Sequence, residues 1–107
     1  MAEVLVIITS TPSSAAVDGA QRSMLQLLDA FKIAYTTVDG GEPANKELRT
    51  AAWAVSGKRV VYPQLFVREA GGELRFLGDW DALEKLNESN SDHQGLDAAL
   101  AGLPRKE

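Results

Sequence analysis

The chain has 107 residues, of which 45% are hydrophobic and 24% charged, a composition typical of a globular domain and not of a disordered or fibrous chain. Its 11 basic and 15 acidic residues give a net charge of −4, which argues against nucleic acid as the main partner because such binding depends on a positive surface. The absence of cysteine excludes disulfides, thiolate metal sites and cysteine nucleophiles.

The sequence also bears on location and metal binding. No apolar run approaches the roughly 20 residues that span a bilayer, and no basic segment precedes Val4 as it would in a signal peptide. We therefore expect a cytoplasmic monomer that does not bind membranes. His93 is the single histidine and lies in a polar stretch, so we expect no metal site and no histidine-based catalytic triad.

The first third of the chain predicts a strand, a helix and a second strand. Val4–Ile8 is an uninterrupted apolar run, typical of a buried strand. The polar loop Thr9–Ser14 follows, and its serines favour a helix N-cap. Ile33–Val38 alternates and predicts the second strand. Between them, apolar residues recur at helical spacing up to about Lys32: Ala16, Ala20, Met24, Leu27, Leu28 and Phe31.

A second helix is predicted from about Ala44 to Val55, because Pro43 suits a first helical position and Gly57 suits an end. Trp53 falls outside the apolar stripe of this helix, and the sequence leaves open whether its ring is a partly buried cover or an exposed contact. The residues expected to face inward are Leu48, Ala51, Ala52 and Val55.

The apolar stretch Val60–Val67 contains a proline, which has no N–H to donate to a sheet. We therefore expect the strand to begin at Gln64. The local sequence favours an ordinary trans proline that starts the strand. A cis bond between Tyr62 and Pro63 is the alternative, and it would turn the backbone of Tyr62 outward toward an extended guest.

The last third predicts a hairpin and helices. The strands Gln64–Arg68 and Glu73–Leu77 are joined by a turn with two glycines. Asp79 suits the N-cap of a helix from Trp80 to about Glu88. A last helix is expected over Gly95–Gly102, followed by a frayed tail from Pro104.

The predicted order is β-α-β-α-β-β-α plus a C-terminal helix, in one domain with a core over about residues 3–90 and a C-terminal part over 91–107. Strand–helix–strand units prefer parallel crossovers, whereas the final hairpin must be antiparallel. A mixed four-stranded sheet flanked by helices satisfies both, which is the thioredoxin-like arrangement.

Two motifs within this order carry a family resemblance. The runs from Tyr62 to Phe66 and from Phe76 to Leu83 are similar to the SH3 domain-binding glutamic acid-rich-like family, and the whole order resembles glutaredoxin. The resemblance covers roughly residues 3–90. Where glutaredoxins carry redox cysteines, this chain has Thr11-Pro12-Ser13-Ser14. Because a hydroxyl cannot exchange with a disulfide, we expect no thiol–disulfide oxidoreductase activity.

The resemblance also implies a ligand groove. Tyr62 matches the residue whose backbone holds the cysteinyl part of glutathione, before a cis proline. Gly78 and Asp79 match the turn that receives the γ-glutamyl end, at a helix start that attracts a carboxylate. The alternative is that Gly78 and Asp79 only stop the strand and cap the helix. The proline-rich segment and the glutamate-rich tail of the family's namesake are missing, so direct SH3 binding is not supported.

Two functions follow from this resemblance. The first is a redox-inactive, glutaredoxin-like module that binds or regulates a protein partner of unknown identity. The alternative is a module that binds glutathione or a γ-glutamyl compound, the one cofactor considered. The expected groove residues are Pro12, Ser13, Ser14, Tyr62, Pro63, Gly78, Asp79 and Trp80, none of them catalytic.

Two further features of the sequence bear on function. A glutathione transferase-like enzyme using Ser13 would need a second, helical domain, for which no residues remain. Lys58, Arg59 and Arg68 bracket the proline stretch and could attract an anionic ligand or an acidic peptide. The alternative is that these three side chains are solvated edge charges.

Overall fold

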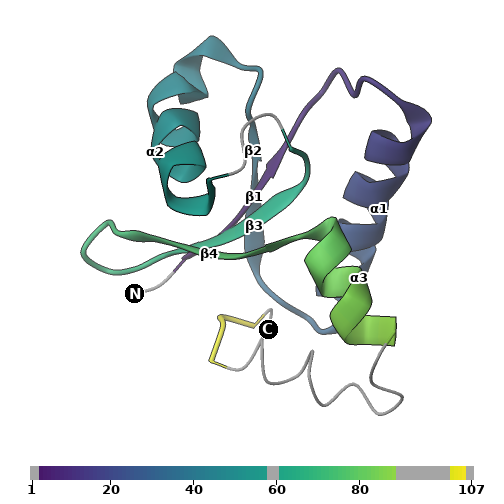
Figure 1. The fold of residues 1–107 in the computed structure, drawn as a ribbon. Coiled ribbons are helices and arrows are strands. Elements are labelled where there is room, and N and C mark those ends of the chain that lie inside the picture. The colour runs from purple at the N-terminus through teal and green to yellow at the C-terminus, as the bar shows by residue number, and fades with distance from the viewer. Residues whose placement is uncertain (1–2, 58–60, 89–101, 106–107) are drawn as a thin grey trace.

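Four strands form one mixed sheet with helices on both of its faces (Figure 1) in a computed structural model that describes residues 3–57, 61–88 and 102–105. The elements are β1 (Glu3–Ile8), α1 (Ala15–Ala30), β2 (Tyr35–Asp39), the short 3-10 helix η1 (Pro43–Asn45), α2 (Lys46–Ser56), β3 (Gln64–Arg68), β4 (Leu74–Asp79) and α3 (Trp80–Glu88). The order of the strands in the sheet is β2-β1-β3-β4.

The strand directions are those that the sequence predicts. β1 pairs with β2 in parallel, whereas β1–β3 and β3–β4 are antiparallel. The crossover from β1 to β2 contains α1, and the β3–β4 connection is a tight hairpin in which Glu69 N–H donates to Glu73 O at 2.8 Å. The predicted thioredoxin-like topology is confirmed for the described residues.

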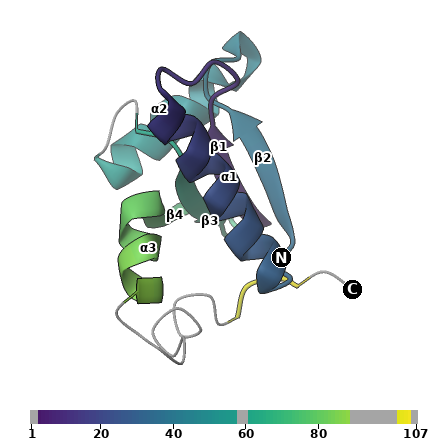
Figure 2. The same ribbon diagram turned by 90° about the vertical axis from the view of Figure 1, so that its right-hand side faces the viewer.

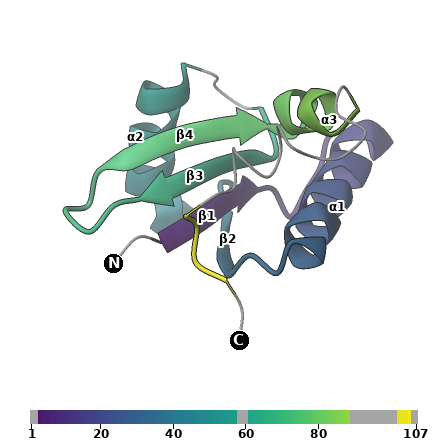
Figure 3. The same ribbon diagram turned by 90° about the horizontal axis from the view of Figure 1, so that it is seen from below.

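The core lies on both faces of the sheet because neighbouring side chains of a strand point in opposite directions. Val4 and Val6 of β1 face α1 and α3, whereas Leu5 and Ile7 face α2. Figure 2 shows α1 and α3 on the same face, and in Figure 3 the sheet separates them from α2. The first face is completed by Met24, Leu28, Ile33, Leu65, Val67, Leu83 and Leu103, and the second by Val38, Ala52, Trp53 and Phe66.

The ends of the first two helices follow from local chemistry. Ser14 caps α1, and its hydroxyl oxygen accepts a hydrogen bond from Val17 N–H at 3.2 Å. Gly57 ends α2 with a φ of 70°, a conformation that glycine adopts at no steric cost. Both signals were readable in the sequence.

The predicted buried face of α2 is confirmed at Leu48 and Ala52 but wrong at Ala51 and Val55. Trp53 is buried at 9% exposure, whereas Val55 is 47% exposed and Ala51 is also exposed. The helix is turned so that Ala52 and Trp53 meet the sheet. The physical reason is that an indole ring removes more apolar surface from water than a valine side chain does. The same finding resolves the open position of Trp53.

The predicted frayed tail is wrong for residues 104 and 105. Leu103 is buried, Ala34 N–H donates to Pro104 O at 2.9 Å, and Arg105 forms an isolated antiparallel bridge with Ile33. Burial of Leu103 against the core holds this segment beside the chain that leads into β2. The helix expected over Gly95–Gly102 lies outside the described residues except for its last residue, and His93 lies outside them too.

Over the described ranges, none of the helices has the length and hydropathy that a bilayer crossing requires.

Candidate functional site

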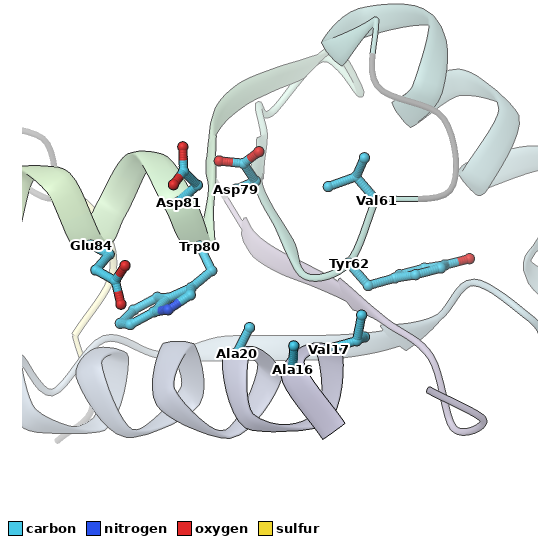
Figure 4. A pocket seen from close by; sticks show the side chains of 9 residues that line it. All are labelled: Ala16, Val17, Ala20, Val61, Tyr62, Asp79, Trp80, Asp81 and Glu84. Carbon is cyan, nitrogen blue, oxygen red and sulfur yellow. The ribbon is translucent and has the colours of Figure 1, made fainter. Parts of the chain in front are cut away.

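A groove of about 240 Å³ lies where α1, the chain before β3 and the start of α3 meet (Figure 4). Its floor comes from α1, one end from the turn into β3, and the opposite end and the upper wall from the β4–α3 junction. The lining residues are Ala16, Val17, Ala20, Val61, Tyr62, Asp79, Trp80, Asp81 and Glu84.

The turn before β3 contains a cis proline and a hydrogen bond from a buried side chain. The peptide bond between Tyr62 and Pro63 is cis, the alternative that the family resemblance implied and that the local sequence did not favour. Local sequence decides little here because the trans preference of an X–Pro bond is only about 0.5–1 kcal/mol. Gln64 is fully buried, and its side-chain amide donates to Val61 O at 2.9 Å.

The Tyr62 ring is part of the core more than of the groove. Its centroid lies 5.8 Å from that of Trp53 at an interplanar angle of 68°, an edge-to-face contact. A Cβ atom on Gly40 would lie 2.9 Å from the Tyr62 hydroxyl oxygen, so the ring rests directly on that glycine. Figure 4 shows the ring pointing away from Trp80. Tyr62 therefore closes one end of the groove without filling it.

The opposite end of the groove is built at the junction of β4 and α3. Gly78 is buried with a φ of 156°, and a Cβ there would lie 3.2 Å from the Ala82 methyl group. The carboxylate of Asp79 accepts a hydrogen bond from Ala82 N–H at 2.9 Å, so its predicted role as a helix cap is confirmed. The N–H of Ala82, one of the groups at this helix start that could bind a ligand carboxylate, therefore already donates to Asp79.

The loop between β1 and α1, where the resemblance places the missing cysteines, is tied down on both sides. Thr9 N–H donates to the side-chain oxygen of Gln21 at 2.7 Å, inside the protein. On the other side, the Asp39 carboxylate accepts from Gly41 N–H at 2.9 Å and from Ser10 N–H at 3.4 Å. Hydrogen bonding by the Ser10 side chain, followed by the Gly41 N–H, lowers the pKa of Asp39 below its ordinary value of 3.8.

The structure brings only some of the expected groove residues together. Tyr62, Asp79 and Trp80 line the groove. Pro63 and Gly78 are each next in sequence to a lining residue, but both are buried and do not line the groove. Three residues of the loop before α1 do not line it either: Pro12 is half-buried, Ser13 is exposed, and the Ser14 hydroxyl is the N-cap of α1.

The floor of the groove was not predicted from the sequence, and of the acidic wall, which consists of Asp79, Asp81 and Glu84, only Asp79 was expected. Ala16 and Ala20, four residues apart on α1, belong to the predicted apolar face of that helix, and their small size is what opens the floor. Small side chains on a helix that faces another helix leave room between them, and this was a readable signal. Glu84 stands four residues after Trp80, so both lie on one face of α3.

The described lining is acidic. It holds the carboxylates of Asp79, Asp81 and Glu84 and no basic side chain, and Asp81 forms an exposed ion pair with Lys85 at 3.1 Å. These acidic residues do not form a metal site, since within residues 3–57, 61–88 and 102–105 no three potential ligands are suitably grouped.

The expected role of the bracketing basic residues is not supported at Arg68. This residue is the last of β3, whereas the groove adjoins the first, and its guanidinium pairs with the Glu3 carboxylate. Lys58 and Arg59 lie outside the described residues.

Comparison with solved structures defines the class of protein. A buckwheat glutaredoxin–glutathione complex aligns with a TM-score of 0.56 and 16% identity over 94% of this chain and 81% of that one. The holo form of glutaredoxin C1 from Populus tremula × tremuloides aligns with a TM-score of 0.59 and 21% identity over 98% of this chain and 85% of that one. At these identities the likeness shows the fold alone: the chain has the glutaredoxin-like form of the thioredoxin fold.

The sequence itself gives the family. The model of the family described as "SH3-binding, glutamic acid-rich protein" matches residues 2–97, and the chain belongs to that family. A search of curated protein sequences finds no match to the chain.

Proposed function

We propose that this chain is a redox-inactive, glutaredoxin-like protein whose groove binds a segment of another protein. The observation that carries the proposal is the combination of a formed groove with a loop that contains Thr11, Ser13 and Ser14 where a glutaredoxin would place its thiols. Disulfide exchange requires a thiolate, and the chain has no cysteine at any position. Binding is the part of the glutaredoxin function that these residues can still perform.

The size and lining of the groove favour a peptide segment. Its volume of about 240 Å³ lies below the range of about 300–1,000 Å³ that is typical of small-molecule sites. Ala16, Val17 and Ala20 leave the floor low enough for a peptide backbone to approach. Trp80 is half-buried and Val61 is 37% exposed, so both offer apolar contact area, and tryptophan is enriched among residues that dominate binding energy.

The family's description points to a protein partner, but a proline-rich ligand motif is not the means of contact that this sequence offers. Its four prolines stand at positions 12, 43, 63 and 104, so none lie three residues apart as a polyproline ligand requires. We therefore place the contact in the groove and not in a proline-rich segment.

A second candidate is a site for glutathione or another γ-glutamyl compound. It is favoured by the position of Asp79 at the start of α3, where a carboxylate could accept from a ligand ammonium group, and by the buckwheat glutaredoxin, whose structure contains glutathione. Against it stand the three groove carboxylates, because glutathione itself carries two carboxylates and one ammonium group. Like charges at close range weaken binding.

Selection from a random-peptide phage library tests the proposal. The wild-type protein should enrich groove-binding peptides, and Ala16→Trp should abolish their binding because the indole would occupy the exposed start of the groove floor. The matched control is Ala30→Trp, an exposed substitution at the other end of α1, which should bind as the wild type does. Failure to enrich any peptide that Ala16→Trp loses, combined with saturable binding of reduced glutathione, would favour the second candidate instead.

A further inference from the structure

The acidic wall of the groove indicates what its occupant must carry. We propose that the bound peptide segment presents a lysine or arginine side chain to Glu84 and Asp81, beside the Trp80 ring; this rests on the proposed function and adds the chemistry of the partner. A basic side chain is the complement of a lining whose described residues include three carboxylates and no cation.

Glu84 is the carboxylate best placed for this contact. It is half-buried, and it forms no ion pair with any residue in the part of the chain that the structure describes. Figure 4 shows its carboxylate beside the Trp80 indole, both projecting from α3 toward α1. A cation in this position would meet a carboxylate and an aromatic ring together, and each of them attracts it.

The carboxylates of Asp79 and Asp81 are less available to a ligand than that of Glu84. Asp79 is only 7% exposed and caps α3 through Ala82 N–H, so it contributes negative potential more than a direct contact. Asp81 is exposed and forms an ion pair with Lys85, with 3.1 Å between Lys85 Nζ and Asp81 Oδ2. This surface pair is weak enough for a partner's guanidinium to compete with it. The central contact is therefore with Glu84, supported by Asp81.

The apolar part of the groove sets the neighbours of the basic residue. Ala16, Val17 and Ala20 on the floor and Val61 at the rim suit small or β-branched side chains on either side of it. The occupant is thus an extended segment with one basic residue among small apolar ones. An acidic segment would place its charge against the three described carboxylates, so this lining disfavours it.

The phage selection described above gives the first test. Peptides enriched by the wild type should contain lysine or arginine more often than the starting library, and those enriched by Asp81→Asn/Glu84→Gln should not. Enrichment of groove-binding peptides without a basic residue would overturn this inference while leaving the proposed function intact. If no peptide were enriched, the proposed function would fail, and this inference with it.

A paired-peptide titration gives the second test. A selected peptide and its arginine-to-citrulline version have the same shape and differ by one charge. We expect the wild type to bind the arginine peptide about fivefold more tightly, the size of a partly exposed ion pair, and the difference to shrink as salt is raised. Asp81→Asn/Glu84→Gln should remove the difference. An unchanged ratio in that variant would overturn the inference.

The matched control is Glu42→Gln/Glu47→Gln. It also removes two negative charges, but from exposed residues outside the groove, before and within the first turn of α2. This variant should keep the fivefold preference. If it lost the preference as Asp81→Asn/Glu84→Gln does, net charge and not the groove would explain the selectivity, and the inference would be wrong.

Discussion

Thr9 and Gln21 exchange two hydrogen bonds across the junction of β1 and α1. The N–H of Thr9 donates to Gln21 Oε1 at 2.7 Å, and Gln21 Nε2 donates to Thr9 O at 3.2 Å. Both residues are buried. The pair fixes the start of the loop where the family resemblance places the missing cysteines, and it supports α1, which forms the groove floor.

Gln21→Leu should therefore destabilise the protein. The substitution preserves bulk but leaves the buried N–H and C=O of Thr9 without their partner, a loss of about 1–3 kcal/mol. Urea unfolding followed by circular dichroism measures it. Gln26→Leu, an exposed change on the same helix, is the control and should stay within about 0.5 kcal/mol of the wild type. Equal effects of the two changes would mean that the Thr9–Gln21 pair contributes nothing.

Gly40→Ala should also destabilise the fold, because Tyr62 leaves no room for a methyl group. The new Cβ would lie 2.9 Å from Tyr62 Oη and 3.3 Å from Ile7 Cγ2. Overpacking of this kind costs about 1–3 kcal/mol. Gly41→Ala is the matched control, since its Cβ would meet only Asp39 Oδ1 at an ordinary 3.4 Å. A smaller loss for Gly40→Ala in a Tyr62→Phe background would show that the Tyr62 hydroxyl is part of the obstacle, and an equal loss would show that the hydroxyl plays no part in it.

Trp53→Ala and Val55→Ala test the orientation of α2. Trp53 is 9% exposed and packs with Leu5, Ile7 and Phe66, so its truncation should cost about 3–5 kcal/mol. Val55 is 47% exposed, and its truncation should change the free energy of unfolding by less than about 0.5 kcal/mol. The reverse ranking would mean that the helix is turned as the sequence pattern predicted.

Leu103→Ala should show that the C-terminal segment is part of the core. Leu103 is 7% exposed and belongs to the cluster that contains Ile33 and Leu28, so the expected loss is about 2–5 kcal/mol. Pro104→Ala is the control, because it keeps the carbonyl that accepts from Ala34 N–H. Thermal unfolding of both variants measures the difference. If Leu103→Ala unfolded at the same temperature as the wild type, the segment would not be part of the core.

Asp39 gives a pH dependence whose sign can be stated. Its folded-state pKa is lowered from 3.8 by the Ser10 side chain first and the Gly41 N–H second, so its charged form stabilises the fold above that value. This stability is lost as pH falls through the lowered pKa. The difference in unfolding free energy between the wild type and Asp39→Asn should be constant near neutral pH and shrink below about pH 4. Ser10→Ala should raise the pKa of Asp39, which the carboxyl carbon chemical shift measures in an NMR titration. If the difference in unfolding free energy between the wild type and Asp39→Asn stayed constant down to strong acid, this pH dependence would be contradicted.

The sequence predicted elements wherever local signals agreed with the fold. The apolar run before Thr9, the N-cap at Ser14, the left-handed Gly57 and the cap at Asp79 are each local, and each is where it was expected. These signals depend on a few neighbouring residues, and their chemistry does not change with tertiary context.

Features that depend on distant residues were not predictable in the same way. The orientation of α2 depends on the space that the sheet offers to Trp53. The burial of Leu103 depends on a core cluster that also contains Ile33, seventy positions earlier in the chain. The groove could not be predicted from the sequence because its lining comes from α1 and α3, whose relative placement the sequence does not show. Its floor and its charge are tertiary properties of residues that look ordinary in sequence.

The most direct test is an amide chemical-shift titration of the labelled protein, first with reduced glutathione and then with a selected arginine peptide. We expect glutathione at millimolar concentration to leave the spectrum unchanged, and the peptide to shift Val17, Tyr62, Trp80 and Glu84 saturably. Saturable shifts at Ser13, Tyr62, Gly78 and Asp79 with glutathione alone, and none with the peptide, would contradict the proposal that the groove binds a protein partner.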